Sequence, residues 1–197
     1  MYHKLLTNPS FFPLLLKYDQ DLAEQARQAG CPCNGALHRS DYPRKPRGGP
    51  EDLDPAFNRR ISFCCAEAGC RKRMTPPSIR FLGRRIYLMV VVVLVSAMCQ
   101  GISAKRRKVL SEKIGASGRT LDRWQVWWRD AFVASAFWKE TKSRFIPPIP
   151  TDRLPGSLLE RFNEGVESIN IRRALAFLSP LTTVTCNGKS QDPLRGF

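Results

Sequence analysis

Apolar residues recur at helical spacing near the start of the chain. Phe11, Leu15, Tyr18, Leu22 and Ala26 fall on one stripe of a helix. Asn8 can cap this helix, Pro9 suits its first turn and Gly30 suits its end. We therefore expect residues 1–30 to form an N-terminal packing helix without chemistry of its own.

The most apolar run is residues 86–99, "IYLMVVVVLVSAMC", in which only Ser96 is polar. Its β-branched residues favour a strand when the run is taken alone. A membrane-spanning helix needs about 20 apolar residues, and this run is shorter and has basic residues on both sides. The surrounding pattern favours a buried helix.

Two further helices are predicted after this run. Ser103 can cap a helix over residues 104–114, "GAS" makes a turn, and Ser117 can cap a helix from 118 to about 132. Leu121, Trp124, Trp128 and Phe132 line one face of the second helix, with Trp127 on its flank. Together with the apolar helix, this order is typical of a helix-turn-helix within residues 81–135.

The other segments are less periodic. Residues 31–80 are rich in Cys, Pro, Gly and Arg. This composition is typical of a small module that a bound metal ion holds together, here with a basic loop. Residues 136–197 read as a proline linker, "FIPPIP", two short helices and a mobile tail. Their expected packing residues are Leu158, Leu159, Phe162, Val166, Ile169, Ala174, Phe177 and Leu178. The predicted fold is mainly α, with a three-helix helix-turn-helix core, a zinc-ribbon-like module and short C-terminal helices.

Charge is concentrated in one part of the chain. The formal net charge is +15, and residues 31–129 hold 20 basic against 7 acidic residues. A local excess of this kind suits a polyanion, nucleic acid before an anionic membrane surface. A scattered, merely solvated surface charge is the alternative.

Five of the seven cysteines fall between residues 31 and 70. Cys31 and Cys33 form one pair, and Cys65 and Cys70 form a second, with Cys64 and His38 as alternate ligands. Clustered thiols in a reducing compartment favour metal over disulfides, so we expect a structural Zn²⁺. Free buried cysteines are the other interpretation. Cys99 and Cys186 lie apart and are assigned to no metal.

Double-stranded DNA is the expected partner. The predicted contacts are Arg119, Thr120, Arg123 and Trp127 on the last helix, Lys105, Arg106, Arg107 and Lys108 on the helix before it, Arg71, Lys72 and Arg73 after the last clustered cysteine, and Arg44, Lys45 and Arg47 in the basic loop. A plain helical bundle with a solvated charged face is the alternative.

Three stretches, "CPCNGALHRSDYPRKPRGG", "FCCAEAGCRKRMTPPSIRFLGRR" and "SEKIGASGRTLDRWQVWW", carry a resemblance. Together they are similar to the zinc-ribbon and helix-turn-helix front half of bacterial insertion-sequence transposases. Those proteins continue into an RNase H-like domain with three metal-binding carboxylates, which the residues after Phe132 do not match. The resemblance therefore implies a DNA-recognition protein of a mobile element, not an enzyme.

The expected role is accessory or regulatory, as a homodimer or beside an element-encoded recombinase. The first residues lack a secretory signal pattern and no membrane span is expected, so the expected compartment is the cytoplasm. With His3 and His38 as its two histidines, the chain offers no Ser/His/Asp set. An adaptor whose zinc module binds protein, an RNA-binding protein and a truncated transposase remnant are the alternatives.

Overall fold

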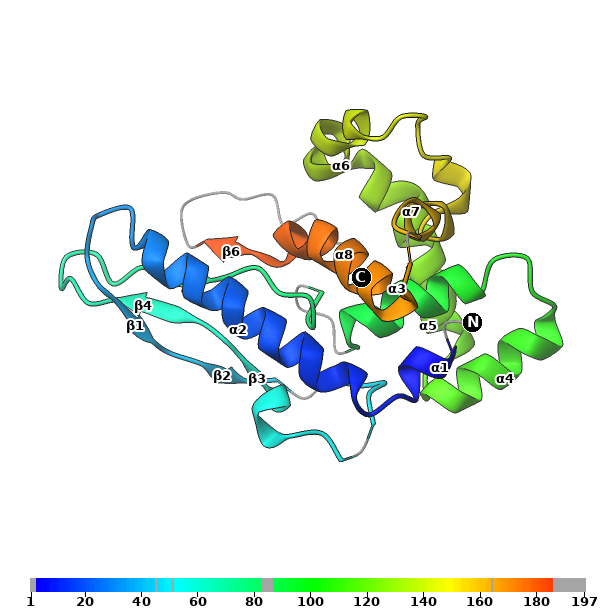
Figure 1. Cartoon of the computed structure of the whole chain (residues 1–197), viewed down its shortest axis with the longest axis horizontal. Helices are drawn as coiled ribbons and strands as arrows, with labels where there is room; N and C mark the ends of the chain where they lie inside the picture. Colours follow the sequence, from blue (N-terminus) through cyan, green and yellow to red (C-terminus); the bar gives the residue numbers. More distant parts are fainter. Residues whose placement is uncertain (1–2, 45, 51, 83–86, 164, 186–197) are drawn as a thin grey trace.

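The computed structural model describes residues 3–44, 46–50, 52–82, 87–163 and 165–185 (Figure 1). This part of the chain is mainly helical, with eight α-helices and a small antiparallel sheet. A mainly α fold is therefore confirmed.

The chain begins with a short helix α1 (His3–Leu6) and a long helix α2 (Phe11–Ala29). Asn8 does not cap α2 as predicted. Its Oδ1 accepts a hydrogen bond from the Ser10 N–H, 3.0 Å away, within the turn between the two helices, and Ser10 precedes α2. Gly30 ends α2 as predicted, with a φ of 73° that favours glycine.

Four short strands form an antiparallel sheet in the order β1-β4-β5-β6. The strands are β1 (Leu37–Arg39), β4 (Phe63–Cys65), β5 (Arg73–Thr75) and β6 (Val184–Thr185). The strands β2 (Tyr42–Pro43) and β3 (Arg59–Arg60) pair separately, with the 3₁₀ helix η1 (Pro55–Asn58) before β3. The C-terminal segment thus contributes a strand to the sheet of the cysteine module, which the sequence did not indicate.

The inner face of this sheet packs on α2. Ile61 and Phe63 are buried with Ala23 of α2, and Leu37 and Met74 pack against them. Residues paired across the strands share a face, so His38, Cys64 and Arg73 lie together on the opposite face.

The three helices predicted after residue 80 are all present. They are α3 (Met89–Met98), α4 (Ala104–Ile114) and α5 (Gly118–Val126). The Ser103 and Ser117 hydroxyls accept the predicted cap bonds from Arg106 and Thr120, and Gly115 ends α4 in a left-handed conformation. The helix that begins with α5 continues through a π-helical segment η2 (Trp127–Phe132).

Short helices complete the chain. They are α6 (Ala136–Thr141), η3 (Lys142–Arg144), η4 (Thr151–Arg153), α7 (Gly156–Arg161), α8 (Glu167–Leu178) and η5 (Ser179–Thr182). The two short helices predicted here correspond to α7 and α8. Val166 and Ile169 were expected to pack, but they are 62% and 37% exposed, because they lie at the solvent-facing start of α8. The predicted mobile tail after Thr185 lies outside the described residues.

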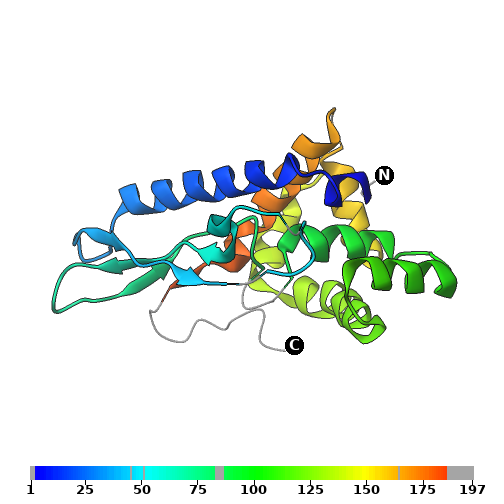
Figure 2. The same ribbon diagram turned by 90° about the horizontal axis from the view of Figure 1, so that it is seen from below.

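One hydrophobic core unites the helices, with α3 at its centre. Phe12, Phe57, Val91 and Leu175 are all buried in it, so residues from every predicted segment contribute. In Figure 2, α2 runs along one edge of the molecule. The sheet lies beside its C-terminal half, and α3, α4 and α5 lie around and beyond its N-terminal end. None of the helices in the described part of the chain has both the length and the apolar character that a bilayer crossing requires.

A buried ion pair joins α2 to the segment that leaves the cysteine module. Arg80 Nε lies 2.7 Å from Asp19 Oδ2, and both side chains are fully buried. Asp19 also accepts bonds from the Ser78 hydroxyl and the Ile79 N–H, and Arg80 donates to the carbonyls of Phe57 and Arg59. The two charges are therefore fully hydrogen-bonded, as buried charges must be.

We expect Asp19→Asn to destabilise the protein by about 3–5 kcal/mol, because Arg80 would keep a buried charge without its counter-ion. Asp21→Asn on the exposed face of the same helix is the matched control, and we expect it to change stability by less than about 0.5 kcal/mol. Urea unfolding of both variants provides the measurement. Equal stabilities would contradict the role of this ion pair.

Candidate metal centre and basic surfaces

Four cysteine sulfurs meet at the end of the sheet. The Sγ atoms of Cys31, Cys33, Cys65 and Cys70 all lie within 4.8 Å of one another. Cys31 Sγ is 3.7 Å from Cys70 Sγ, and Cys33 Sγ is 3.4 Å from Cys65 Sγ. A tetrahedral ion with metal–sulfur bonds of about 2.3 Å needs sulfurs about 3.8 Å apart. The four sulfurs therefore have the arrangement of a four-thiolate metal site.

Two similar turns bring the cysteines together. Cys31 follows the end of α2 and begins a turn in which the Asn34 N–H donates to its carbonyl at 2.8 Å. Cys65 ends β4, and Cys70 follows in a turn closed by its own N–H bond to the Glu67 carbonyl at 3.0 Å. Asn34, the last residue of the first turn, has a positive φ of 62°, and Arg71, which directly follows the second turn, has a positive φ of 43°. This reversal lets each turn present its sulfurs toward the other.

Backbone N–H groups favour the thiolate form at this cluster. The N–H groups of Cys33, Gly35 and Glu67 donate to the sulfurs of Cys31, Cys33 and Cys65. The Gly35 N–H and the neighbouring thiols lower the pKa of Cys33 to about 7, whereas burial raises the pKa of Cys65 to about 12. A bound cation would compensate for gathering four thiolates, and its binding would release the remaining protons.

The geometry decides between the alternate ligands. Cys65 faces the cluster, whereas Cys64 and His38 lie on the outer face of the sheet, opposite each other in register. The thiol of Cys64 is 3.6 Å from the Arg71 carbonyl oxygen. Cys99 is near Arg107 and Asp122, away from the cluster, and Cys186 lies outside the described residues.

Gly35 has no side chain, and two of the cysteine sulfurs lie where a side chain would begin. A Cβ at this position would lie 2.7 Å from Cys65 Sγ and 3.2 Å from Cys33 Sγ. The close approach of backbone and sulfur therefore requires glycine here, a constraint that the spacing of the cysteines did not reveal.

The predicted DNA contacts on the helices differ in exposure. Lys105, Arg106 and Lys108 of α4 are exposed, as are Arg119 and Arg123 of α5. Arg107 is different, because its guanidinium forms an ion pair with Asp122 of α5. Thr120 is partly buried, and its hydroxyl is 3.0 Å from that of Ser117.

The prediction that Trp127 is available to DNA is wrong. Trp127 is 1% exposed, and its ring packs on Trp128 and Phe132 at centroid distances of 4.7 Å and 5.5 Å. It begins the π-helical segment, whose wider turn brings Trp127 and Trp128 into the core together. Trp127 instead lines a depression of about 360 Å³ together with Arg119 and Arg123.

The other predicted contacts lie on the cysteine module and the basic loop. Arg71 and Arg73 are exposed, and Lys72 is partly buried; Arg73 Nη2 donates to the Ser40 hydroxyl at 2.9 Å. Arg47 is exposed and Arg44 is partly buried, whereas Lys45 lies outside the described residues. Exposed basic side chains therefore occur at three places, on α4 and α5, on the segment after Cys70, and on the basic loop.

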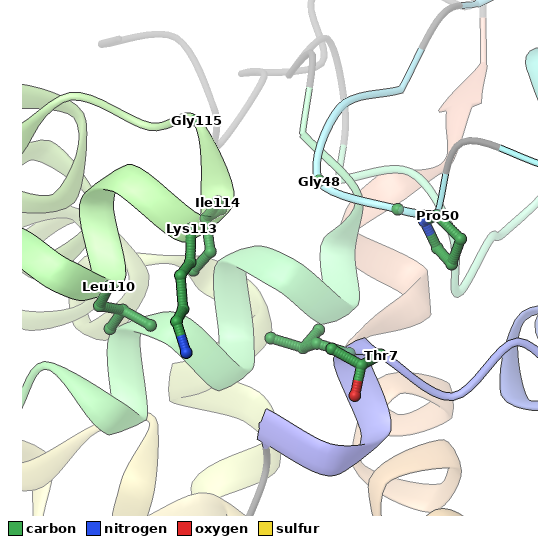
Figure 3. A pocket seen from close by; sticks show the side chains of 9 residues that line it. Thr7, Gly48, Pro50, Leu110, Lys113, Ile114 and Gly115 are labelled. Atoms are coloured by element: carbon green, nitrogen blue, oxygen red, sulfur yellow. The ribbon is translucent and has the colours of Figure 1, made fainter.

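A hollow of about 490 Å³ separates the basic loop from α4. Figure 3 shows Gly48 and Pro50 on one side and Leu110, Lys113, Ile114 and Gly115 on the other, with Thr7 below them. The loop and the turn after α4 thus face each other across this hollow.

Comparisons of the chain with protein-family models, with curated proteins and with solved structures gave no match.

We expect the purified protein to carry about one zinc ion per chain, since four thiolates complete a tetrahedral site. Cys65→Ser should lose most of the bound metal and increase hydrogen exchange in residues 31–80, while α3, α4 and α5 stay protected. Cys64→Ser is the matched control and should retain the metal. Metal analysis with hydrogen exchange tests both variants, and equal metal contents would contradict the ligand assignment.

Gly35→Ala should weaken metal binding by about tenfold or more, because the added Cβ displaces two of the sulfurs. At Gly69, by contrast, an added Cβ would meet nothing within 4 Å, so Gly69→Ala should leave the affinity unchanged. Competition with a zinc chelator measures both affinities. A similar affinity in the two variants would show that the space at Gly35 is not required.

Proposed function

We propose that this protein binds double-stranded DNA through a helix-turn-helix formed by α4 and α5, and that a structural Zn²⁺ on Cys31, Cys33, Cys65 and Cys70 holds its zinc-ribbon-like module together. The observation that carries the proposal is the outer face of α5. Arg119 and Arg123 project to solvent there, one turn apart, while Leu121 and Trp124 are buried on the opposite face.

Contacts between α3, α4 and α5 support this proposal, because a helix that recognises base edges must be held in a fixed orientation by its neighbours. Gln125 Nε2 of α5 donates to the Ser96 carbonyl of α3 at 2.6 Å, and Asp122 pairs with Arg107 of α4. The Tyr87 hydroxyl donates to the Gly115 carbonyl in the turn at 2.9 Å. The three helices therefore form one unit in which α5 keeps a fixed orientation.

The charges on the two helices divide into two roles. Arg119 lies in the first turn of α5, the end that lies closest to base edges in a helix-turn-helix, and Arg123 follows it one turn later. Their guanidinium groups suit the O6 and N7 atoms of guanine. Lys105, Arg106 and Lys108 of α4 would contact phosphates, which fix position without reading sequence.

The zinc-ribbon-like module adds a second basic region to the interface. Arg71, Lys72 and Arg73 follow Cys70 directly, so the metal would fix the backbone that carries them. In this proposal the metal supplies structure and takes no part in a reaction.

The resemblance to the front half of insertion-sequence transposases gives the proposed setting. The protein would serve a mobile element in the cytoplasm as an accessory or regulatory DNA-binding protein without catalysis of its own. A homodimer or an element-encoded recombinase would be its partner in that role. A protein-binding or RNA-binding adaptor and a transposase remnant are alternatives that DNA-binding experiments would distinguish.

Arg123→Ala should relax the preference at one base position more than it lowers overall affinity, because a bidentate arginine–guanine contact contributes about 1–3 kcal/mol of discrimination. Selection of binding sites from a random DNA library, with wild type, Arg119→Ala and Arg123→Ala, measures this preference. If wild type enriches no motif, the DNA-reading proposal fails and the adaptor and RNA-binding alternatives gain support. A motif that both variants preserve would place the reading element outside α5.

Neutralising Arg106 and Lys108 together should weaken binding to all DNA sequences alike. The slope of log affinity against log salt should fall by about one for each phosphate contact removed. Arg107→Ala should reduce the slope less than Arg106→Ala, because Arg107 is already paired with Asp122. A salt titration of each variant is the measurement, and an unchanged slope for Arg106→Ala and Lys108→Ala would assign them to a solvated face.

A further inference from the structure

The basic loop is attached to the chain directly before α3. The Leu88 N–H donates to the Arg47 carbonyl at 3.0 Å, and Arg47 and Tyr87 form a parallel bridge. Because α3 begins at Met89, the backbone of Arg47 lies beside the entry to the first helix of the α3–α4–α5 unit.

Two glycines fix the loop at this place. Gly48 has a φ of +88°, and a Cβ there would lie 2.9 Å from the side chain of Val91. A Cβ on Gly49 would lie 2.9 Å from Leu53 and 3.0 Å from Leu88. The backbone after Arg47 is therefore packed directly on buried side chains, so the exposed Arg47 projects from a fixed base.

The same attachment connects Arg47 to the turn between α4 and α5. Tyr87, its bridge partner, donates its hydroxyl to the Gly115 carbonyl, and its ring packs edge-on against Trp124 of α5 at a centroid distance of 5.1 Å. Gly48 and Gly115 also line the same hollow (Figure 3). The backbone of Arg47 is therefore connected to α5 through Tyr87.

This position has a consequence if α5 lies in a major groove. In three-helix DNA-binding units, the last helix occupies the major groove, and the segment that precedes the first helix can reach the adjacent minor groove. Arg47 lies beside that segment. We propose that Arg47 enters the minor groove next to the major groove that holds α5 and selects A·T base pairs there.

The proposal rests on the DNA-binding function proposed above and adds a second reading position to it. A·T-rich DNA has a narrow minor groove with enhanced negative potential, which attracts arginine. The fixed backbone at Gly48 and Gly49 would lower the cost of ordering this contact. Arg47 would therefore contribute selectivity for the flank of the site, separate from the motif that Arg119 and Arg123 read.

Modified bases can distinguish a minor-groove contact from a major-groove contact. An inosine·cytosine pair lacks the 2-amino group of guanine, so its minor-groove edge matches A·T while its major-groove edge matches G·C. The test measures the affinity of the full-length protein for its selected motif with A·T, inosine·cytosine or G·C pairs in the flank. Wild type should bind the first two alike and about 5- to 30-fold more tightly than the third.

Arg47→Ala should keep the selected motif and bind all three flanks alike. Arg144→Ala is the matched control, because it removes one exposed arginine from η3, beside α6, and should keep the flank preference. Loss of the preference in both variants would mean that total charge decides it and would overturn the proposal. Retention of the preference in Arg47→Ala would overturn it as well.

Two further outcomes separate this inference from the proposed function. If wild type enriches no DNA motif, the DNA-binding function itself fails. If wild type enriches a motif but shows no flank preference, or treats inosine·cytosine like G·C, the minor-groove role of Arg47 fails and the helix-turn-helix proposal stands.

Discussion

The arrangement of the molecule depends on the buried pair of Asp19 and Arg80. Burying two charges costs more than their attraction returns unless their polar atoms are hydrogen-bonded. Here the Ser78 hydroxyl and the Ile79 N–H donate to Asp19, and the carbonyls of Phe57 and Arg59 accept bonds from Arg80. Arg80 also lies between the rings of Phe57 and Phe81, 4.9 Å and 4.8 Å from their centroids. The pair therefore fixes the long helix, the exit of the cysteine module and the segment around η1 in one arrangement.

A second buried arginine extends this framework to the C-terminal segment. Burial lowers the pKa of Arg60, whose guanidinium donates to the carbonyls of Pro76 and Thr182. The Ser78 N–H donates to the Thr182 hydroxyl at 2.8 Å, shortly before β6 joins the sheet. The sheet is too small to bury much apolar surface, so its stability rests on these polar contacts, on α2 and on the four clustered cysteines.

The helical end of the molecule is organised differently, around apolar contacts. The buried α3 gives α4 and α5 a common base, and aromatic rings from Tyr87 to Phe132 fill the space beneath α5. This leaves the polar face of α5 exposed. The basic loop, the turn after α4 and the start of α3 meet at Tyr87, so the proposed reading elements share one support.

The sequence by itself determined the features that follow local rules. Serine caps and the glycine at 115 set the bounds of α4 and the start of α5, and the helices predicted after the apolar run favoured a buried helix over a strand for the run itself. Four of the clustered cysteines were correctly singled out by spacing. Tertiary structure alone decided that Cys65 faces the cluster while Cys64 faces outward, that Trp127 is buried, and that Asp19 meets Arg80. Each of these depends on contacts between residues far apart in the chain, and the energy of such contacts is absent from any local pattern.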